Sequence, residues 1–145
     1  MIYINKIFFK NFRNFHNLEL MFQDKCNVLF GNNGAGKTNI LEGISLLSKG
    51  RGIRNSSYSN LVKNDQVNFS IKSSININKV EYDIDIFTET RENKLRKNIK
   101  INNDSSKEAV NLLNSSLSFL IFIPEMERLF LSSPNSRRNF IDRLI

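Results

Sequence analysis

Apolar and polar residues alternate with a period of two in three stretches of the second half of the chain. The stretches cover residues 67–77, 80–86 and 95–101. Such alternation predicts strands of an antiparallel sheet with one face toward solvent. Two more runs near the N-terminus, residues 2–9 and 18–22, also have strand patterns, and the Arg13-Asn14 step between them predicts a turn.

A different pattern follows these two runs. Residues 28–30 form a short apolar run that ends directly at Gly31. Beyond the glycine-bearing segment, Ile40, Leu41, Ile44 and Leu47 recur at helical spacing. The order predicted is therefore strand, glycine-rich loop, helix.

The rest of the chain supplies further elements. Residues 49–65 are polar and rich in Gly and Ser, which favours a loop with short turns. Ser105 and Glu108 form a capping box that predicts a short helix through Leu113. The apolar run 117–123 is typical of a strand buried on both faces in a parallel sheet, and Pro124 and the Ser133-Pro134 step predict helix starts after it.

These elements predict one α/β domain over residues 1–145, with parallel core strands and an antiparallel β subdomain inserted after the first helix. A chain of this length can bury a substantial core. It has one cysteine and one histidine, which excludes an internal disulfide and a zinc-type cluster. It contains no long apolar run and no signal peptide, so we expect a cytoplasmic protein that does not associate with membranes.

The chain has a formal net charge of +7 and a pI near 9.7. An excess of this size favours an acidic partner, most commonly nucleic acid. The alternative is a solvated lysine-rich surface, because Asn, Lys and Ile are all abundant. Charge alone does not separate the two interpretations.

Residues 31–38, GNNGAGKT, match the phosphate-binding pattern G-x-x-x-x-G-K-[ST]. Its glycines permit backbone conformations in which successive N–H groups surround phosphate oxygens. The Lys37 ammonium can reach the β- and γ-phosphates, and the Thr38 hydroxyl can bind Mg²⁺. The sequence thus predicts a site for a nucleoside triphosphate with Mg²⁺, and the alternative is a structural turn that matches by chance.

Four segments together resemble the RecF family of bacterial recombination mediators. They are KNFRNF at 10–15, GNNGAGKTNILEGI at 31–44, KGRGIRN at 49–55 and FIPEMERLFLSSPNSRRNFIDRL at 122–144. This family resembles ABC-type ATPases of the SMC class, in which two heads enclose ATP between them. The resemblance implies ATP and Mg²⁺ as cofactors, an ATP-dependent homodimer, binding of DNA, and RecO and RecR as partners in recombinase loading during DNA repair, replication and the SOS response to DNA damage.

The resemblance also implies roles for individual residues. Glu125 stands in place of the Q-loop and would be a metal ligand beside Thr38. The candidate DNA phosphate contacts are Arg51, Arg54, Arg137 and Arg138. The residues expected at the nucleotide are Arg13, Asn14, Gly31, Asn32, Asn33, Gly34, Ala35, Gly36, Lys37, Thr38 and Asn39.

The family's ABC signature motif and Walker B segment have no counterpart in residues 1–145. We therefore expect the N-terminal part of an ATP-binding head that binds ATP without hydrolysing it efficiently alone, and no catalytic residue in this chain. A nucleotide-binding module without turnover, arising as a fragment or from a shortened gene, remains open. A small P-loop kinase or GTPase is the other alternative, disfavoured because an Asn-Lys-x-Asp guanine-recognition segment is missing from the sequence.

Overall fold

A computed structural model describes residues 1–48, 50–117, 119, 134–135 and 138. Its main feature is a five-stranded sheet in the order β2-β1-β3-β4-β5, antiparallel at every pairing. The strands are β1 (Ile2–Phe12), β2 (Phe15–Met21), β3 (Ser70–Ile77), β4 (Val80–Arg91) and β5 (Lys94–Ile101). The helices are α1 (Lys37–Ser45), the 3-10 helix η1 (Tyr58–Leu61) and α2 (Lys107–Ser116).

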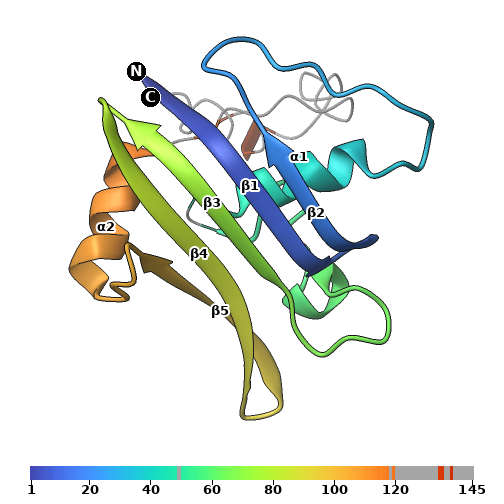
Figure 1. The fold of residues 1–145 in the computed structure, drawn as a ribbon. Helices are drawn as coiled ribbons and strands as arrows, with labels where there is room; N and C mark the ends of the chain where they lie inside the picture. The colour runs from blue at the N-terminus through green and yellow to red at the C-terminus, as the bar shows by residue number, and fades with distance from the viewer. Residues whose placement is uncertain (49, 118, 120–133, 136–137, 139–145) are drawn as a thin grey trace.

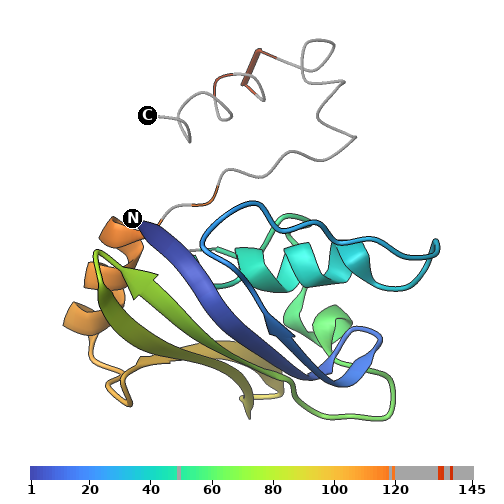
Figure 2. The same ribbon diagram turned by 45° about the horizontal axis from the view of Figure 1, so that its top comes forward.

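Both α-helices cover the same face of the sheet, behind it in the view of Figure 1 and more clearly separated in Figure 2. The period-two alternation explains this arrangement, because it places one apolar row of each strand on that face. Ile7, Ser73, Ile84 and Ile101 lie side by side across four strands and are buried. The fold is therefore two-layered over its described part.

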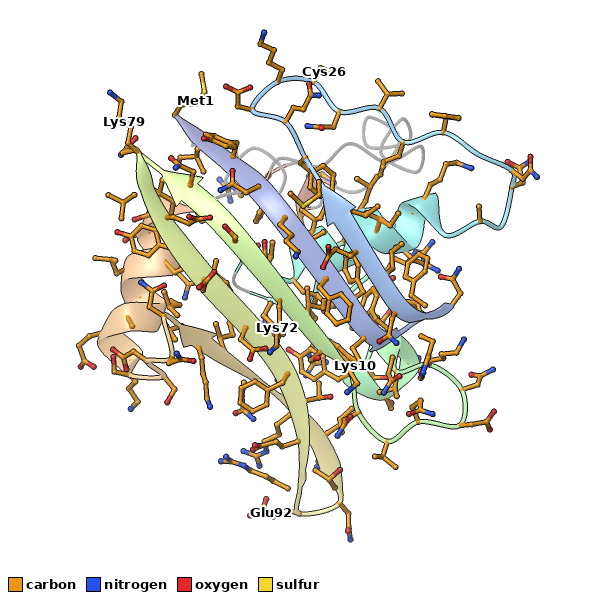
Figure 3. All side chains as sticks on the ribbon, in the orientation of Figure 1. Met1, Lys10, Cys26, Lys72, Lys79 and Glu92 are labelled. Carbon is orange, nitrogen blue, oxygen red and sulfur yellow. The ribbon has the colours of Figure 1, made fainter. Side chains whose placement is uncertain are left out.

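The opposite face of the sheet is polar and carries no helix in the described part of the chain. Lys72 lies between Phe8 and Asp85 in the strand register, and Asp85 lies opposite Lys100. Figure 3 labels Lys10 and Lys72 on this face. The antiparallel sheet with one face toward solvent is thus confirmed.

The approach of α1 to the sheet is close enough to exclude a side chain at Gly43. A Cβ atom there would overlap Cε1 of Phe9, whose side chain is fully buried. Phe9 also stacks on Phe12, with ring centroids 5.5 Å apart. The glycine therefore fixes the distance between α1 and β1, and with it the position of the loop that precedes α1.

Two sequence predictions about elements need correction, and a third falls mostly outside the described residues. The N-terminal hairpin is not separate from the antiparallel subdomain, because β1 pairs with both β2 and β3. Residues 28–30 are not a strand: no strand of the described part pairs with them, and Val28 and Phe30 are 77% and 92% exposed. In the run predicted as a second parallel strand, Leu117 is buried, while residues 118 and 120–123 lie outside the described residues.

The start of α2 was predicted one residue too early. Ser106, not Ser105, is the N-cap, and its Oγ accepts a hydrogen bond from the Ala109 N–H at 3.2 Å. Asp104 favours Ser106 over Ser105 as the N-cap, because its carboxylate accepts hydrogen bonds from both the N–H and the hydroxyl of Ser106. These two bonds, the backbone one first, also lower the pKa of Asp104.

Candidate nucleotide-binding site

The glycine-rich segment forms a tight loop at the start of α1. Gly34 and Gly36 have φ angles of 83° and 100°, which residues with a Cβ rarely adopt. The Ala35 N–H donates to the Asn32 carbonyl at 3.2 Å, and the Ile40 N–H donates to the Gly36 carbonyl at 3.0 Å as α1 begins. The predicted order of loop and helix is therefore present, with the positive end of the helix dipole at the loop.

The ammonium of Lys37 folds back across the loop. Its Nζ donates to the Gly31 carbonyl at 2.7 Å and to the Asn32 carbonyl at 2.8 Å. These bonds hold a positive charge against the first turn of the loop, where a phosphate group would compete for the same donor. The ammonium of Lys37 therefore lies against the loop in this structure.

The loop is supported from outside by the β1–β2 turn. A Cβ atom on Gly36 would lie 2.5 Å from Cζ of Phe15 and 2.8 Å from Nδ2 of Asn14. Asn14 Nδ2 donates to the Ala35 carbonyl at 3.4 Å, and Asn14 Oδ1 accepts from Asn39 Nδ2 at 2.9 Å. The structure therefore brings Asn14, Asn39 and the loop together, as the resemblance implied.

Arg13 is held by a carboxylate of α1. Its guanidinium binds Glu42 through two hydrogen bonds of 2.8 Å, and the Glu42 side chain is 0% exposed. Arg13 also donates to the Asn60 carbonyl and to Ser56 Oγ. Its φ of 53° is unusual for a residue with a side chain, so these bonds also stabilise a strained turn.

The second cation at Glu42 is Arg54. Its NH1 donates to Glu42 Oε2 at 3.3 Å and to Asn39 Oδ1 at 3.2 Å. Ser45 fixes the same segment, because its hydroxyl accepts from the Ile53 N–H at 3.0 Å and donates to the Glu42 carbonyl at 2.6 Å. Arg54 is therefore an ion-pair partner of α1, 43% exposed at its side chain.

Four predicted residues remain: Arg51, Arg138, Glu125 and Arg137. Arg51 is exposed in the loop after α1, and Arg138 is helical and exposed. Glu125 and Arg137 lie outside the described residues. The structure thus brings Arg13, Asn14, Asn39 and Arg54 together beside the loop.

Lys97 on β5 holds the other end of α1. Its Nζ donates to the carbonyls of Leu46, Ser48 and Gly50 at 3.1, 3.4 and 3.1 Å. A cation at a helix C-terminus interacts favourably with the dipole and with the terminal carbonyls. Burial nevertheless lowers the pKa of Lys97 to about 8.

This lowered pKa predicts a pH dependence of stability. Between about pH 8 and pH 10.5, the unfolded chain keeps a proton on Lys97 that the folded chain has released, so folding becomes more favourable as pH rises. We expect the free energy of unfolding to increase by roughly 2 kcal/mol across this window, relative to Lys97→Met. Urea unfolding of both proteins at several pH values measures it. Lys94→Met, an exposed lysine on the same strand, is the control, and equal slopes for all three proteins would contradict the prediction.

Sequence reasoning missed Glu42 beside the loop and Lys97 at the C-terminal end of α1. Glu42 carried one signal, since it is an acidic residue between the apolar positions Ile40 and Ile44 on the packed side of the helix. No sequence feature indicated a role for Lys97, except that it occupies a position of the apolar row of its strand, between Leu95 and Ile99. Both contacts join residues far apart in the chain.

The site fits a triphosphate with its metal only in part. The loop backbone and Lys37 suit phosphate oxygens, and Thr38 is exposed at the first turn of α1, where its hydroxyl can reach a metal bound to those phosphates. Within the described ranges, no group of three or more His, Cys, Asp or Glu side chains is placed to hold a metal ion. Of the two residues predicted as Mg²⁺ ligands, Thr38 is therefore the one that the structure describes.

The α/β fold and the glycine-rich loop at the start of α1 define a P-loop nucleotide-binding domain. Residues 6–143 match the model of the AAA domain family. The chain belongs to this family and is homologous to RecF proteins. In the described part of the chain, no helix has the length and apolar character needed to span a bilayer.

The most similar relatives include the DNA replication and repair proteins RecF of Rickettsia canadensis (strain McKiel) and Natranaerobius thermophilus. The first is 36% identical over 145 residues and the second 34% over 142 residues. These alignments cover 99% and 98% of this chain, but 39% and 36% of the relatives.

Two solved structures of recombination mediator protein RecF are also similar. One is RecF-ATPrS in RecFOR pathway, with a TM-score of 0.82 and 33% identity over 98% of this chain and 38% of that chain. The other is RecF-ATP in the same pathway, with a TM-score of 0.80 and 33% identity over 97% and 38%. The chain thus spans about two fifths of the length of these proteins.

Proposed function

We propose that this chain binds ATP with Mg²⁺ through residues 31–39, as the N-terminal part of the nucleotide-binding head of a RecF-type DNA repair protein. The observation that carries the proposal is the loop itself, in which Lys37 is folded onto the Gly31 and Asn32 carbonyls at the dipole end of α1. The similarity to RecF structures whose names include ATP supports the choice of nucleotide.

Nucleotide titrations of the chain test this proposal. Phosphate contacts supply most of the binding at such a loop, so we expect ATP with Mg²⁺ to bind at least 100-fold more tightly than adenosine. We also expect this chain alone not to hydrolyse ATP efficiently, because residues 1–145 contain no Walker B carboxylate. Equal affinities for ATP and adenosine would refute the proposal, and phosphoryl transfer to a small acceptor would favour the kinase alternative.

In the whole protein we propose ATP-dependent dimerisation and binding of DNA, including junctions of duplex with single strand, in the cytoplasm. RecO and RecR would be its partners in loading recombinase. Arg51, Arg54, Arg137 and Arg138 are the proposed phosphate contacts, with Glu125 as an additional metal ligand. The similarity to repair proteins and the net charge of +7 support this assignment.

Arg51 offers the clearest test of DNA binding, because it is exposed, whereas Arg54 is paired with Glu42. We expect Arg51→Ala to weaken duplex binding several-fold on every sequence and to reduce the slope of log affinity against log salt by about 0.9. Fluorescence anisotropy at four salt concentrations measures both quantities. The charge-matched control is Lys79→Ala in the β3–β4 turn, and identical slopes for the two variants would contradict a phosphate contact at Arg51.

A further inference from the structure

Asn14 and Asn39 connect the phosphate-binding loop to a buried ion pair through a continuous series of hydrogen bonds. The series runs from the Ala35 carbonyl through Asn14 and Asn39 to Arg54. Arg54 in turn binds Glu42, which is anchored on Arg13. Three separate chain segments, residues 13–14, 35–42 and 54, therefore meet at one side of the loop.

The ends of this series determine how both amides are oriented. A backbone carbonyl only accepts hydrogen bonds, so Asn14 must present its NH₂ group to Ala35 and its oxygen to Asn39. A guanidinium only donates, so Asn39 must present its oxygen to Arg54 and its NH₂ group to Asn14. Reversing either amide would place two acceptors or two donors against each other.

The orientation of Asn14 has a consequence for the peptide bond between Ala35 and Gly36. In a planar trans peptide, the C=O and the following N–H point in opposite directions. Because the Ala35 carbonyl points at Asn14, the Gly36 N–H points away from Asn14. Gly36 tolerates this arrangement because its φ is 100° and because it lacks the Cβ that would overlap Asn14.

We propose that Asn14 and Asn39 are positioning residues that orient the Ala35–Gly36 peptide so that the Gly36 N–H faces the phosphates of a bound nucleotide. Glu42 and Arg54 hold the far end of the series. This inference rests on the proposed nucleotide binding and adds to it the residues that preorganise the loop. A preorganised donor binds an anion more tightly than one that must first be reoriented.

Asn14→Ala and Asn39→Ala test this role, with Asn17→Ala as the matched control. Asn17 is exposed on β2 of the same hairpin and lies opposite Lys10, outside the site. We expect each test substitution to weaken ATP binding roughly tenfold, as for a weakened hydrogen bond to a charged group. The double variant should lose no more than either single one, because both substitutions break the same series. Melting temperatures should stay close to that of the parent, since both side chains lie at the edge of the fold.

A second measurement does not depend on nucleotide. In ¹⁵N NMR spectra of the chain without nucleotide, Asn14→Ala should shift the Gly36 amide and the Asn39 side-chain resonances, and Asn17→Ala should leave both in place. An unshifted Gly36 amide in Asn14→Ala would overturn the proposal even if ATP did not bind at all. A second outcome would overturn the positioning role while leaving the proposed function intact. In that outcome the parent binds ATP, Lys37→Ala fails to bind it, and both single asparagine variants keep the parent's affinity.

Discussion

Replacing Lys37 with alanine is expected to weaken ATP binding by roughly 100-fold or more, while the chain remains folded. Each hydrogen bond to a charged group contributes about 1.5 to 3 kcal/mol, and the ammonium can serve two phosphates. In the structure the same ammonium binds the Gly31 and Asn32 carbonyls, and both residues are exposed. Water can satisfy these carbonyls after the substitution, so we expect little change in melting temperature.

Isothermal titration with ATP and Mg²⁺ measures the affinity, and circular dichroism measures the fold. Lys79→Ala removes the same charge from the β3–β4 turn and should bind ATP as the parent does. Equal affinities in Lys37→Ala and Lys79→Ala would show that the loop does not hold phosphates in the assumed way. A loss in both would indicate only a general effect of net charge.

The largest expected effect on stability is that of Glu42→Ala. The Glu42 carboxylate is 0% exposed and binds two guanidinium groups, of which Arg13 is 21% exposed at its side chain. Removing one partner of a buried ion pair leaves the other charge uncompensated, which costs about 3 kcal/mol or more. For a domain of this size, we expect the melting temperature to fall by roughly 10 °C.

The matched control is Glu19→Ala, because Glu19 pairs with Lys6 at 2.8 Å in an exposed position. An exposed pair contributes about 1 kcal/mol at most, so this variant should melt within about 3 °C of the parent. Urea unfolding of the three proteins gives the comparison. Similar destabilisation in Glu19→Ala and Glu42→Ala would mean that burial of the Arg13–Glu42 pair carries little energetic weight.

The sequence predicted the strands β3 to β5 well because their pattern is local. Residues 80–86 alternate without interruption, residues 95–101 alternate except at Lys97, and one face of each strand must be buried. Residues 28–30 have an equally apolar composition, yet they form no strand, because a strand also requires a hydrogen-bonding neighbour and none of the described strands lies beside them. Composition supplies only one of the two requirements.

The predictions about the candidate site divide in the same way, into those that depend on neighbouring residues and those that depend on packing. The glycine-rich loop before α1 was predicted from spacing within eight residues, and the structure has it there. The phosphate-binding roles of its glycines and of Lys37 stay predictions. Arg54 was predicted as a DNA contact, and the structure shows it bound to Glu42 and Asn39. The side chains of a helix and of a later loop meet only after both have packed, so their pairing leaves no local pattern.

The sequence by itself determined the glycine-rich loop, the helix after it and the alternation of the sheet, since each depends on residues that are neighbours in the chain. Tertiary structure decided that the N-terminal hairpin extends the sheet, that Glu42 holds two arginines, and that Lys97 caps α1 from 51 residues beyond Leu46. These contacts depend on the distance between packed layers. That distance is set by Gly43 against Phe9, which no pattern along the chain encodes.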